Sequence, residues 1–294
     1  MLTVVPVATR PGFDVEAVTC CDDHTQWSVP EVCYEYRVVL VRRGRFRRRV
    51  AGVPTDIDPA VAYLGTPGEE ESFAHPMGGD VCTAIGVAPE LWRSLAGDGA
   101  GPTAQAFYVD PRLDLAHRRL LAAARSGDVD FAVAEELSAL LAAAIDRAMS
   151  GPTPLADASN ERTRSLVATA RHAIADGDPT SDTLFSLAEL LDVSPYRLSR
   201  AFSRALGVSV THYRQRVRIG RALDRLEEGE RNLGLLAADL GYADQAHLTR
   251  TMRRHLGFTP ATLRRLLTPA PETRPIRVER GGHRADRPDF PRWI

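Results

Sequence analysis

Apolar residues follow a helical spacing in two segments of the chain, 194–209 and 244–259, that share one pattern. In both segments they recur at i, i+4 and i+8, which predicts a single buried stripe along a helix, while arginines line the opposite side. A helix with an apolar back and an arginine-rich front, present twice, predicts a chain that contacts DNA in two places. Identical residues occupy the matching positions Leu198/Leu248, Arg200/Arg250, Arg204/Arg254, Leu206/Leu256 and Gly207/Gly257.

A shorter helical pattern precedes each segment, at Leu187–Val193 and Leu236–Tyr242, and each ends at a tight turn. Gly241 can adopt the left-handed conformation that a sharp turn between helices requires, and Asp192 tolerates that conformation better than most residues. Each unit therefore predicts a helix-turn-helix, whose second helix enters the major groove of DNA.

The second helix of each unit has a recognisable start. Ser194 followed by Pro195 predicts an N-cap with proline at the first helical position, and Asp244 is the matching cap fifty positions later. A single copy of such a hairpin is weak evidence for DNA binding, because many small helical hairpins look alike. Two copies in register favour the DNA interpretation.

Residues 161–268 closely resemble the DNA-binding domain of the AraC/XylS family of bacterial transcription regulators. The resemblance implies that a long helix, here Val210–Glu228, joins two recognition helices and places them in successive major-groove turns, about 34 Å apart. The chain departs from the family pattern at Asp192, where glycine is usual, and at Leu248 and Met252, where aromatic residues are commoner. The motifs that carry the resemblance are Leu187-Ala188, Ser194-Pro195, Leu198–Phe202, Leu206–Ser209, Tyr213, Arg218, Ala222, Leu236-Ala237, Gly241–Gln245, Leu248–Arg250 and Leu256–Pro260.

The resemblance assigns DNA-facing residues to both recognition helices. A guanidinium fork matches the O6 and N7 acceptors of guanine, so Arg200 and Arg250 are expected to contact bases, and Gln245 can pair with adenine. Arg204 and Arg254, one turn further on, are expected at phosphates, which position the protein without reading sequence. The complete set is Tyr196, Arg197, Ser199, Arg200, Arg204, Gln245, Ala246, His247, Thr249, Arg250 and Arg254.

The distribution of charge supports this assignment. The whole chain is nearly neutral, with 37 basic and 38 acidic residues, which argues against a protein that coats nucleic acid uniformly. Acidic residues predominate up to residue 159, whereas arginines predominate from 160 to 268. Neutralisation of phosphates supplies much of the affinity for DNA, so the positive excess lies where DNA is expected.

The N-terminal half has a period and composition typical of β-strands. Tyr34–Val50 predicts two strands joined by a turn at Arg43-Gly44, and Val61–Leu64 and Val81–Val87 predict further short strands. The expected fold class is therefore α+β: a small β-barrel with a helical pair, then an all-α domain with two helix-turn-helix motifs. Family members with this layout have a cupin-like effector domain. The arginine-rich run 42–49 is interpreted as the polar face of a hairpin, with anion binding as the alternative.

Cysteines and histidines cluster in the N-terminal half. Zinc and similar soft metals take three or four such ligands in a tetrahedral array, which two adjacent loops could supply here. Zinc-finger spacing and the closely spaced cupin histidines are missing, and cysteine is also a common buried residue. Two interpretations therefore remain open. The residues form a metal or thiol sensor, or they are structural thiols around a pocket for an organic ligand. The candidate ligands are Cys20, Cys21, His24, His75 and Cys82, with Cys33 nearby.

The remaining segments define the expected organisation. Pro111–Arg125 and Val129–Met149 predict a helical pair whose apolar stripe packs either on its own barrel or on a second subunit in a homodimer. We expect an effector domain at 1–105, the helical pair at 106–149, a linker at 150–160, the DNA-binding domain at 161–268 and a disordered tail at 269–294. With no membrane-spanning or signal segment in the pattern, a cytoplasmic protein is expected.

These observations predict a sequence-specific regulator of transcription rather than an enzyme. Its expected partners are double-stranded promoter or operator DNA, RNA polymerase, a second copy of the chain, and a small-molecule or metal effector; no membrane partner is expected. The sequence establishes no cofactor, and zinc or another soft metal in the N-terminal domain is the candidate. The alternative is a cupin-type β-barrel metal enzyme with an appended helical domain, and its only candidate site is the cysteine–histidine cluster.

Overall fold

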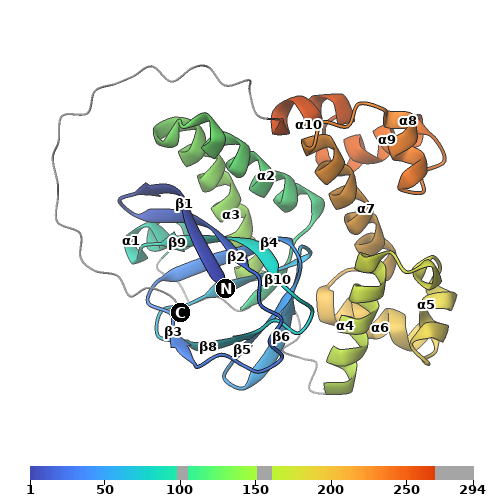
Figure 1. Cartoon of the computed structure of the whole chain (residues 1–294), viewed down its shortest axis with the longest axis horizontal. Coiled ribbons are helices and arrows are strands. Elements are labelled where there is room, and N and C mark those ends of the chain that lie inside the picture. The colour runs from blue at the N-terminus through green and yellow to red at the C-terminus, as the bar shows by residue number, and fades with distance from the viewer. Residues whose placement is uncertain (98–104, 151–160, 269–294) are drawn as a thin grey trace.

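The computed structural model describes residues 1–97, 105–150 and 161–268 of the 294-residue chain. The predicted tail, and the predicted linker except Ser150, lie outside the described residues. The fold is α+β, as predicted, with an antiparallel β-barrel, a helical layer beside it and a C-terminal group of helices (Figure 1).

Two antiparallel sheets form the barrel. The larger has the strand order β1-β2-β9-β4-β7-β10 and the smaller has the order β3-β8-β5-β6. The strands expected around Tyr34–Val50, Val61–Leu64 and Val81–Val87 are all present, whereas β1, β2, β3, β6, β8 and β10 were not predicted. The strands are β1 (Leu2–Arg10), β2 (Phe13–Cys20), β3 (Glu31–Val32), β4 (Tyr36–Arg43), β5 (Phe46–Val50), β6 (Val53–Ile57), β7 (Val61–Gly65), β8 (Glu70–Ala74), β9 (Asp80–Val87) and β10 (Ala106–Tyr108).

The centre of the larger sheet is buried on both faces. Successive side chains of a strand point to opposite sides, and in β4 Val39 and Val41 belong to the apolar cluster between the sheets while Val38 and Leu40 belong to the cluster beneath the helices. This double burial explains why β4 and β7 read as continuous apolar runs rather than as alternating ones.

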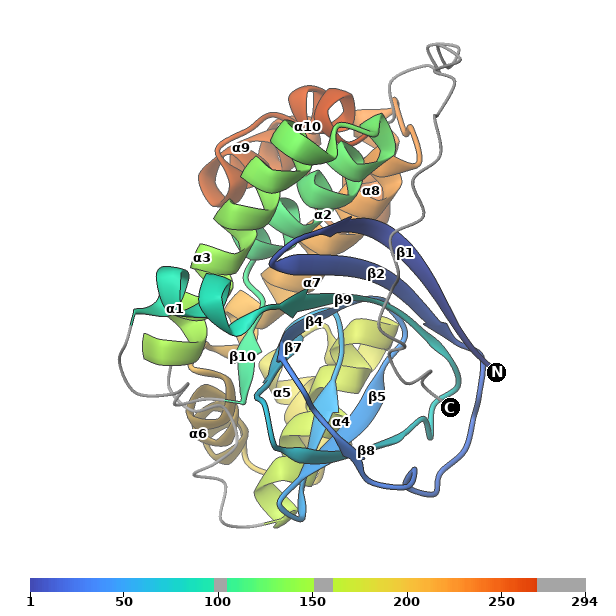
Figure 2. The same cartoon turned by 90° about the vertical axis from the view of Figure 1, so that its left-hand side faces the viewer.

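A helical layer covers the outer face of this sheet (Figure 2). It contains α1 (Pro89–Ala96), α2 (Pro111–Ser126), the short π-helix η1 (Val129–Val133) and α3 (Ala134–Ser150). The predicted stripe packs within the chain, and only Leu121 among its members is half-buried rather than buried. Dimerisation through the exposed sides of these helices stays a prediction. The buried members are Leu113, Leu120, Leu137, Leu140, Leu141 and Ile145.

The C-terminal helices form two similar units at opposite ends of one long helix, α7 (Figure 1). That helix spans Val210–Glu227, as expected from the sequence. Among the described residues, every helix is too short or too polar to span a lipid bilayer. The other elements are α4 (Glu161–Asp176), the 3₁₀ turn η2 (Pro179–Ser181), α5 (Leu184–Leu190), α6 (Pro195–Leu206), α8 (Leu233–Asp239), α9 (Gln245–Leu256) and α10 (Pro260–Leu267).

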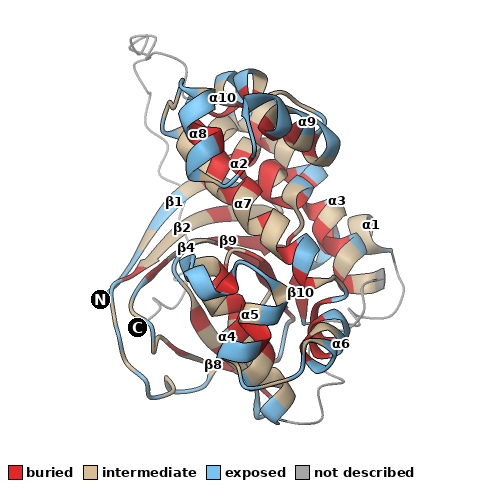
Figure 3. Cartoon of the chain, turned by 90° about the vertical axis from the view of Figure 1, so that its right-hand side faces the viewer, coloured by how far each residue is buried: buried red, intermediate tan, exposed pale blue. Residues whose placement is uncertain are grey.

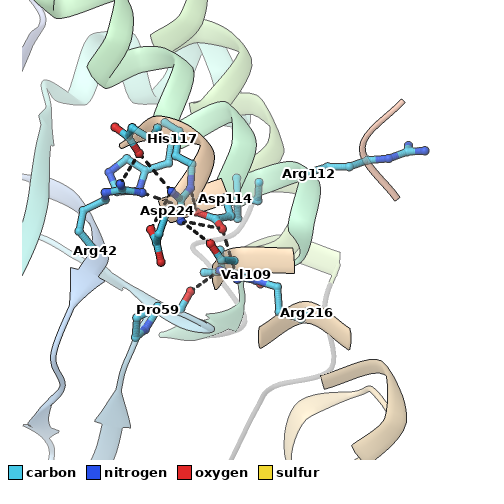
Figure 4. A network of polar contacts seen from close by, with 12 residues as sticks. Arg42, Pro59, Val109, Arg112, Asp114, His117, Arg216 and Asp224 are labelled. Atoms are coloured by element: carbon cyan, nitrogen blue, oxygen red, sulfur yellow. Dashed lines mark hydrogen bonds and ion pairs between the residues drawn. The ribbon is translucent and has the colours of Figure 1, made fainter. Parts of the chain in front are cut away.

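A buried polar network fixes the middle of α7 to the N-terminal half (Figure 4). Arg216 donates from Nε to the carbonyl of Val109 and from Nη2 to that of Pro59, both at 2.7 Å. Asp114 of α2 lies 3.2 Å from Arg216 Nη1 and 3.0 Å from Arg118 Nε. Although burial opposes ionisation, Arg118 and Arg216 hold the pKa of the Asp114 carboxyl well below its usual value. Asp114 is therefore a charged counterion for these two arginines.

Candidate nucleic-acid interface and metal-ligand cluster

The first helix-turn-helix unit consists of α5 and α6. Thr183 and Ser186 cap α5 reciprocally, each side chain bonding the backbone N–H of the other. The turn that follows places Asp192 at a φ of 51°, in the left-handed region. The Ser194 hydroxyl then accepts a hydrogen bond from the N–H of Arg197 at 3.2 Å, with Pro195 as the first residue of α6. The N-cap and the left-handed aspartate are both as the sequence predicts.

The second unit, α8 and α9, repeats this construction with different residues. Asn232 caps α8 by accepting from the N–H of Leu235, and Gly241 occupies the left-handed turn position at a φ of 71°. Asp244 caps α9 by accepting from the N–H of His247 at 2.6 Å. Both recognition helices end at a left-handed glycine, Gly207 and Gly257.

The apolar stripe of each recognition helix is buried, and the opposite face is open (Figure 3). Ser199 and Thr249 are half-buried, at the border between the two faces. The remaining candidate DNA-contacting residues, all exposed, are Tyr196, Arg197, Arg200, Arg204, Gln245, Ala246, His247, Arg250 and Arg254.

The two central arginines differ in their surroundings. Arg200 donates from Nη1 to the Tyr196 hydroxyl at 2.6 Å, and its guanidinium carbon lies 5.4 Å from the centre of the Tyr196 ring. Within the described part of the chain, no hydrogen bond or ion pair engages the guanidinium of Arg250. Both guanidinium groups therefore project into solvent from the open faces, where they can donate to acceptors on a ligand.

Comparison with known proteins finds matches to the C-terminal helices. Residues 187–266 match the family described as "Helix-turn-helix domain". The bifunctional transcriptional activator/DNA repair enzyme AdaA of Bacillus subtilis is 31% identical over 84 residues, which cover 29% of this chain and 40% of AdaA. The arabinose operon regulatory protein of Salmonella typhimurium is 29% identical over 90 residues, covering 30% and 32% of the two chains. The chain thus spans less than half the length of either relative.

The C-terminal half thus carries a helix-turn-helix domain, in agreement with its resemblance to the AraC/XylS family. Among solved structures, the C-terminal domain of AraT, a response regulator from Geobacillus stearothermophilus, is 29% identical, covers 40% of this chain and 97% of its own, and superposes with a TM-score of 0.35. The departures from the AraC/XylS pattern leave the framework intact, because Leu248 and Met252 are fully buried and Asp192 takes the conformation of the glycine that it replaces.

The structure brings together only part of the predicted metal-ligand set. Cys20 Sγ, a ring nitrogen of His75 and a carboxylate oxygen of Asp80 lie within 4.8 Å of one another. His24 adjoins this group through a contact of 3.2 Å between its Nε2 and His75 Nδ1. Cys82 is buried two residues beyond Asp80, and burial raises the pKa of its thiol well above the usual value. We call Cys20, His75 and Asp80 the metal-ligand cluster.

Two of the cysteines lie apart from this cluster. Cys21 is exposed, and Cys33 donates from Sγ to the carbonyl of Glu35 at 3.0 Å. Asp80 was missed by the sequence analysis, which considered only cysteine and histidine. The available signal was its place in the segment from His75 to Cys82, directly before a predicted strand.

The arginine-rich run does more than cover a hairpin. Arg48 is buried and bonds Glu71 at 2.6 Å within the barrel. Three other arginines form ion pairs with the C-terminal helices, two of them half-buried and Arg43 exposed. Their contacts are Arg42 with Glu227 at 2.8 Å, Arg43 with Glu228 at 3.1 Å and Arg45 with Asp176 at 3.0 Å.

Proposed function

We propose that this chain is a sequence-specific transcription regulator that binds one face of duplex DNA through α6 and α9. The observation that carries the proposal is the pair of open, arginine-bearing helix faces at the two ends of α7. Capped recognition helices with a buried stripe are rigid, so their exposed side chains are held ready for the major groove.

The proposed roles of individual residues follow from their chemistry. Arg200 and Arg250 read guanine, Gln245 reads adenine, and Arg204 and Arg254 bind phosphates. In this proposal the protein acts in the cytoplasm as a homodimer, contacts RNA polymerase at promoters, and has no catalytic role.

The N-terminal half is proposed to be the effector domain. Its interior cluster is continuous with the apolar core of α4, α5 and α6, so a change in the barrel reaches the first DNA-binding unit through direct packing. The signal is proposed to be a metal or a small molecule, and the metal-ligand cluster supports the metal.

Selection of binding sites from random duplexes by the full chain tests the proposal. Wild-type protein is expected to enrich one bipartite site, with the logarithm of affinity falling linearly against that of salt concentration. Arg200→Ala and Arg250→Ala should each weaken binding by about 1–3 kcal/mol and relax the preference at different base positions.

Arg10→Ala is the matched control, because it removes the same charge at an exposed position whose partner is Asp130, far from either unit in sequence. It should leave the selected site and its affinity unchanged. Enrichment of no sequence by wild-type protein at moderate salt would refute the proposed function.

A further inference from the structure

We propose that Cys20, His75 and Asp80 bind a soft or borderline divalent metal such as Zn²⁺, and that the β4–β5 turn transmits its occupancy to the DNA-binding units. The inference deepens the proposed function, on which its second half rests. Each half has its own experiment.

The backbone brings the three residues together. Cys20 at the end of β2 is the cross-strand partner of Asp80 at the start of β9, so their side chains are neighbours on the sheet. Gly79 permits this approach, since a Cβ there would lie 2.1 Å from the carbonyl oxygen of Cys20. His75 follows β8 in the short connection to β9, where its N–H donates to the carbonyl of His24 at 2.9 Å.

A chain of hydrogen bonds sets the tautomer of His75. The carbonyl oxygen of Gln26 can only accept, so His24 Nδ1, 2.8 Å away, carries the proton. In a neutral His24 the other nitrogen, Nε2, is then an acceptor, and His75 Nδ1 donates to it at 3.2 Å. In a neutral His75 the Nε2 atom then keeps its lone pair, which is the form in which histidine binds a metal.

That lone pair faces a buried carboxylate. His75 Nε2 lies 3.1 Å from Asp80 Oδ1, and the Asp80 side chain is only 2% exposed. Asp80 Oδ1 has no hydrogen-bond partner among the described residues. A cation between Nε2 and Oδ1, either a metal ion or a proton, stabilises this arrangement, because an unpaired buried charge is costly.

The donor set selects the kind of cation. One thiolate, one imidazole and one carboxylate suit Zn²⁺, whose ligands lie about 2.0–2.3 Å from the ion, and the cysteine disfavours Mg²⁺ and Ca²⁺. Cys82 is buried on the same face of β9 as Asp80, but its thiol is not among the three ligand atoms that lie within 4.8 Å of one another, so water is expected as the fourth ligand. His24 completes the site as the outer partner that orients His75.

The β4–β5 turn connects this site to the C-terminal helices. Gly44, at the tip of the turn, has a φ of 77°, and a Cβ on it would lie 2.3 Å from the carbonyl oxygen of Gly79 and 2.8 Å from Asp80 Cα. The turn therefore rests directly on the backbone that presents Asp80. A shift of the Gly79-Asp80 backbone on metal binding is therefore transmitted to Gly44.

The arginines on either side of Gly44 contact the C-terminal helices. Arg43 binds Glu228 just beyond the end of α7, and Arg45 binds Asp176 at the end of α4. A shift of the turn thus acts on α4, which packs against α6, and on α7, which joins both units. Metal binding and DNA binding are coupled through these contacts.

Calorimetric titration of the full chain with Zn²⁺, after purification without a histidine tag and treatment with chelator, tests the site. One ion per chain is expected. Cys20→Ser and Asp80→Asn should each weaken binding by more than about 10-fold, while Cys21→Ser, which alters the exposed neighbouring thiol, should bind as wild type does. No bound Zn²⁺, or an equal loss in Cys21→Ser, would overturn the site and leave a proton between His75 and Asp80.

DNA affinity measured with and without Zn²⁺ tests the coupling. The site selected by the full chain should bind about 5-fold or more differently in the two states, and DNA should change the affinity for Zn²⁺ by the same factor. The double variant Arg43→Gln/Arg45→Gln should still bind one Zn²⁺ but lose most of this difference. An unchanged difference in that variant, or none in wild type, would overturn the coupling. DNA binding in neither state would instead refute the proposed function.

Discussion

The two helix-turn-helix units share one local design but are attached to the rest of the chain differently. The first unit is joined to the barrel by Arg171 of α4, which is 1% exposed and forms an ion pair with the buried Asp58. Its apolar core is also continuous with that of the barrel. The second unit rests on α2, where Arg112 and Arg125 donate to the carbonyls of His255 and Leu267 at 3.3 and 2.9 Å.

This difference shows that local sequence determines the fold of each unit, whereas contacts with the rest of the chain determine how firmly the unit is held in place. A buried charge pair resists separation because either partner alone would be buried without compensation. Hydrogen bonds from partly exposed arginines are replaced by water at little cost. The first unit therefore has the stronger polar attachment, whereas the second unit is attached by weaker hydrogen bonds and by the packing of Leu115 of α2 into its apolar core.

Removal of one attaching arginine from each unit tests directly whether the two attachments differ in strength, and the change at the first unit should give the largest loss of stability. Arg171→Met leaves Asp58 buried and unpaired, so the free energy of unfolding should fall by about 3–5 kcal/mol. Arg112→Met, the matched change at the second unit, should cost less than about 1 kcal/mol. Urea denaturation of the full-length variants measures both. Equal losses would mean that the two attachments do not differ in strength.

Acid should weaken the helix that supports the second unit. Burial lowers the pKa of His117 on α2 to about 3; the positive charges of Arg42, Arg118 and Arg216 lower it further, and Asp114 opposes them. Its Nε2 lies 2.8 Å from the hydroxyl of Thr83.

Below about pH 6.5 this histidine is protonated in the unfolded chain but stays neutral in the folded chain. Stability should therefore fall as the pH drops from about 6.5 to about 3, with a contribution near 1.4 kcal/mol per pH unit from this group. His117→Gln should flatten the pH profile by that amount, whereas His212→Gln, at an exposed position, should not. Identical profiles for all three proteins would contradict the prediction.

The C-terminal fold could be predicted because its determinants are local. Caps, left-handed turn positions and the i, i+4, i+8 stripe are each encoded by residues close together in the sequence. The duplication makes these features easier to detect. Ser194, Asp192 and Gly241 take the conformations that their chemistry favours. The open faces of α6 and α9 follow from the same periodicity.

The N-terminal half could be predicted only in outline. In β1, Leu2 and Val5 are exposed, so this strand lacks the alternation that marks a half-buried strand. Asp80 lies in the segment from His75 to Cys82, but its pairing with Cys20 is a contact across the sheet that no local spacing encodes. The same holds for Arg42, Arg43 and Arg45, whose partners lie more than a hundred residues away.

The turn position offers a smaller test of how alike the two units are. Gly241 has a φ of 71°, and a Cβ there would lie 3.4 Å from Arg218 Nη2. Gly241→Ala should cost about 1–2 kcal/mol, since an ordinary side chain is strained in this conformation. Asp192→Gly should change stability by less than about 1 kcal/mol, because relief of strain is offset by the freer unfolded chain. Thermal unfolding measures both, and a neutral Gly241→Ala would show that the second turn is not constrained.

Removal of a single hydroxyl should give the smallest effect and separates the two recognition helices. Tyr196→Phe deletes the oxygen that accepts from Arg200 but keeps the ring beside the guanidinium. Ala246 occupies the matching position of α9, so Arg250 has no equivalent support.

We therefore expect Tyr196→Phe to weaken binding by about 0.5–1 kcal/mol, only through the half-site that the first unit reads. Competition between duplexes mutated in one half-site or the other measures this effect. In the variant the Arg200 side chain is free and must lose more rotamer entropy when it binds a base. In the wild-type protein the Tyr196 hydroxyl already restricts this side chain before DNA binds. A loss spread equally over both half-sites would mean instead that Tyr196 acts on the placement of the whole domain.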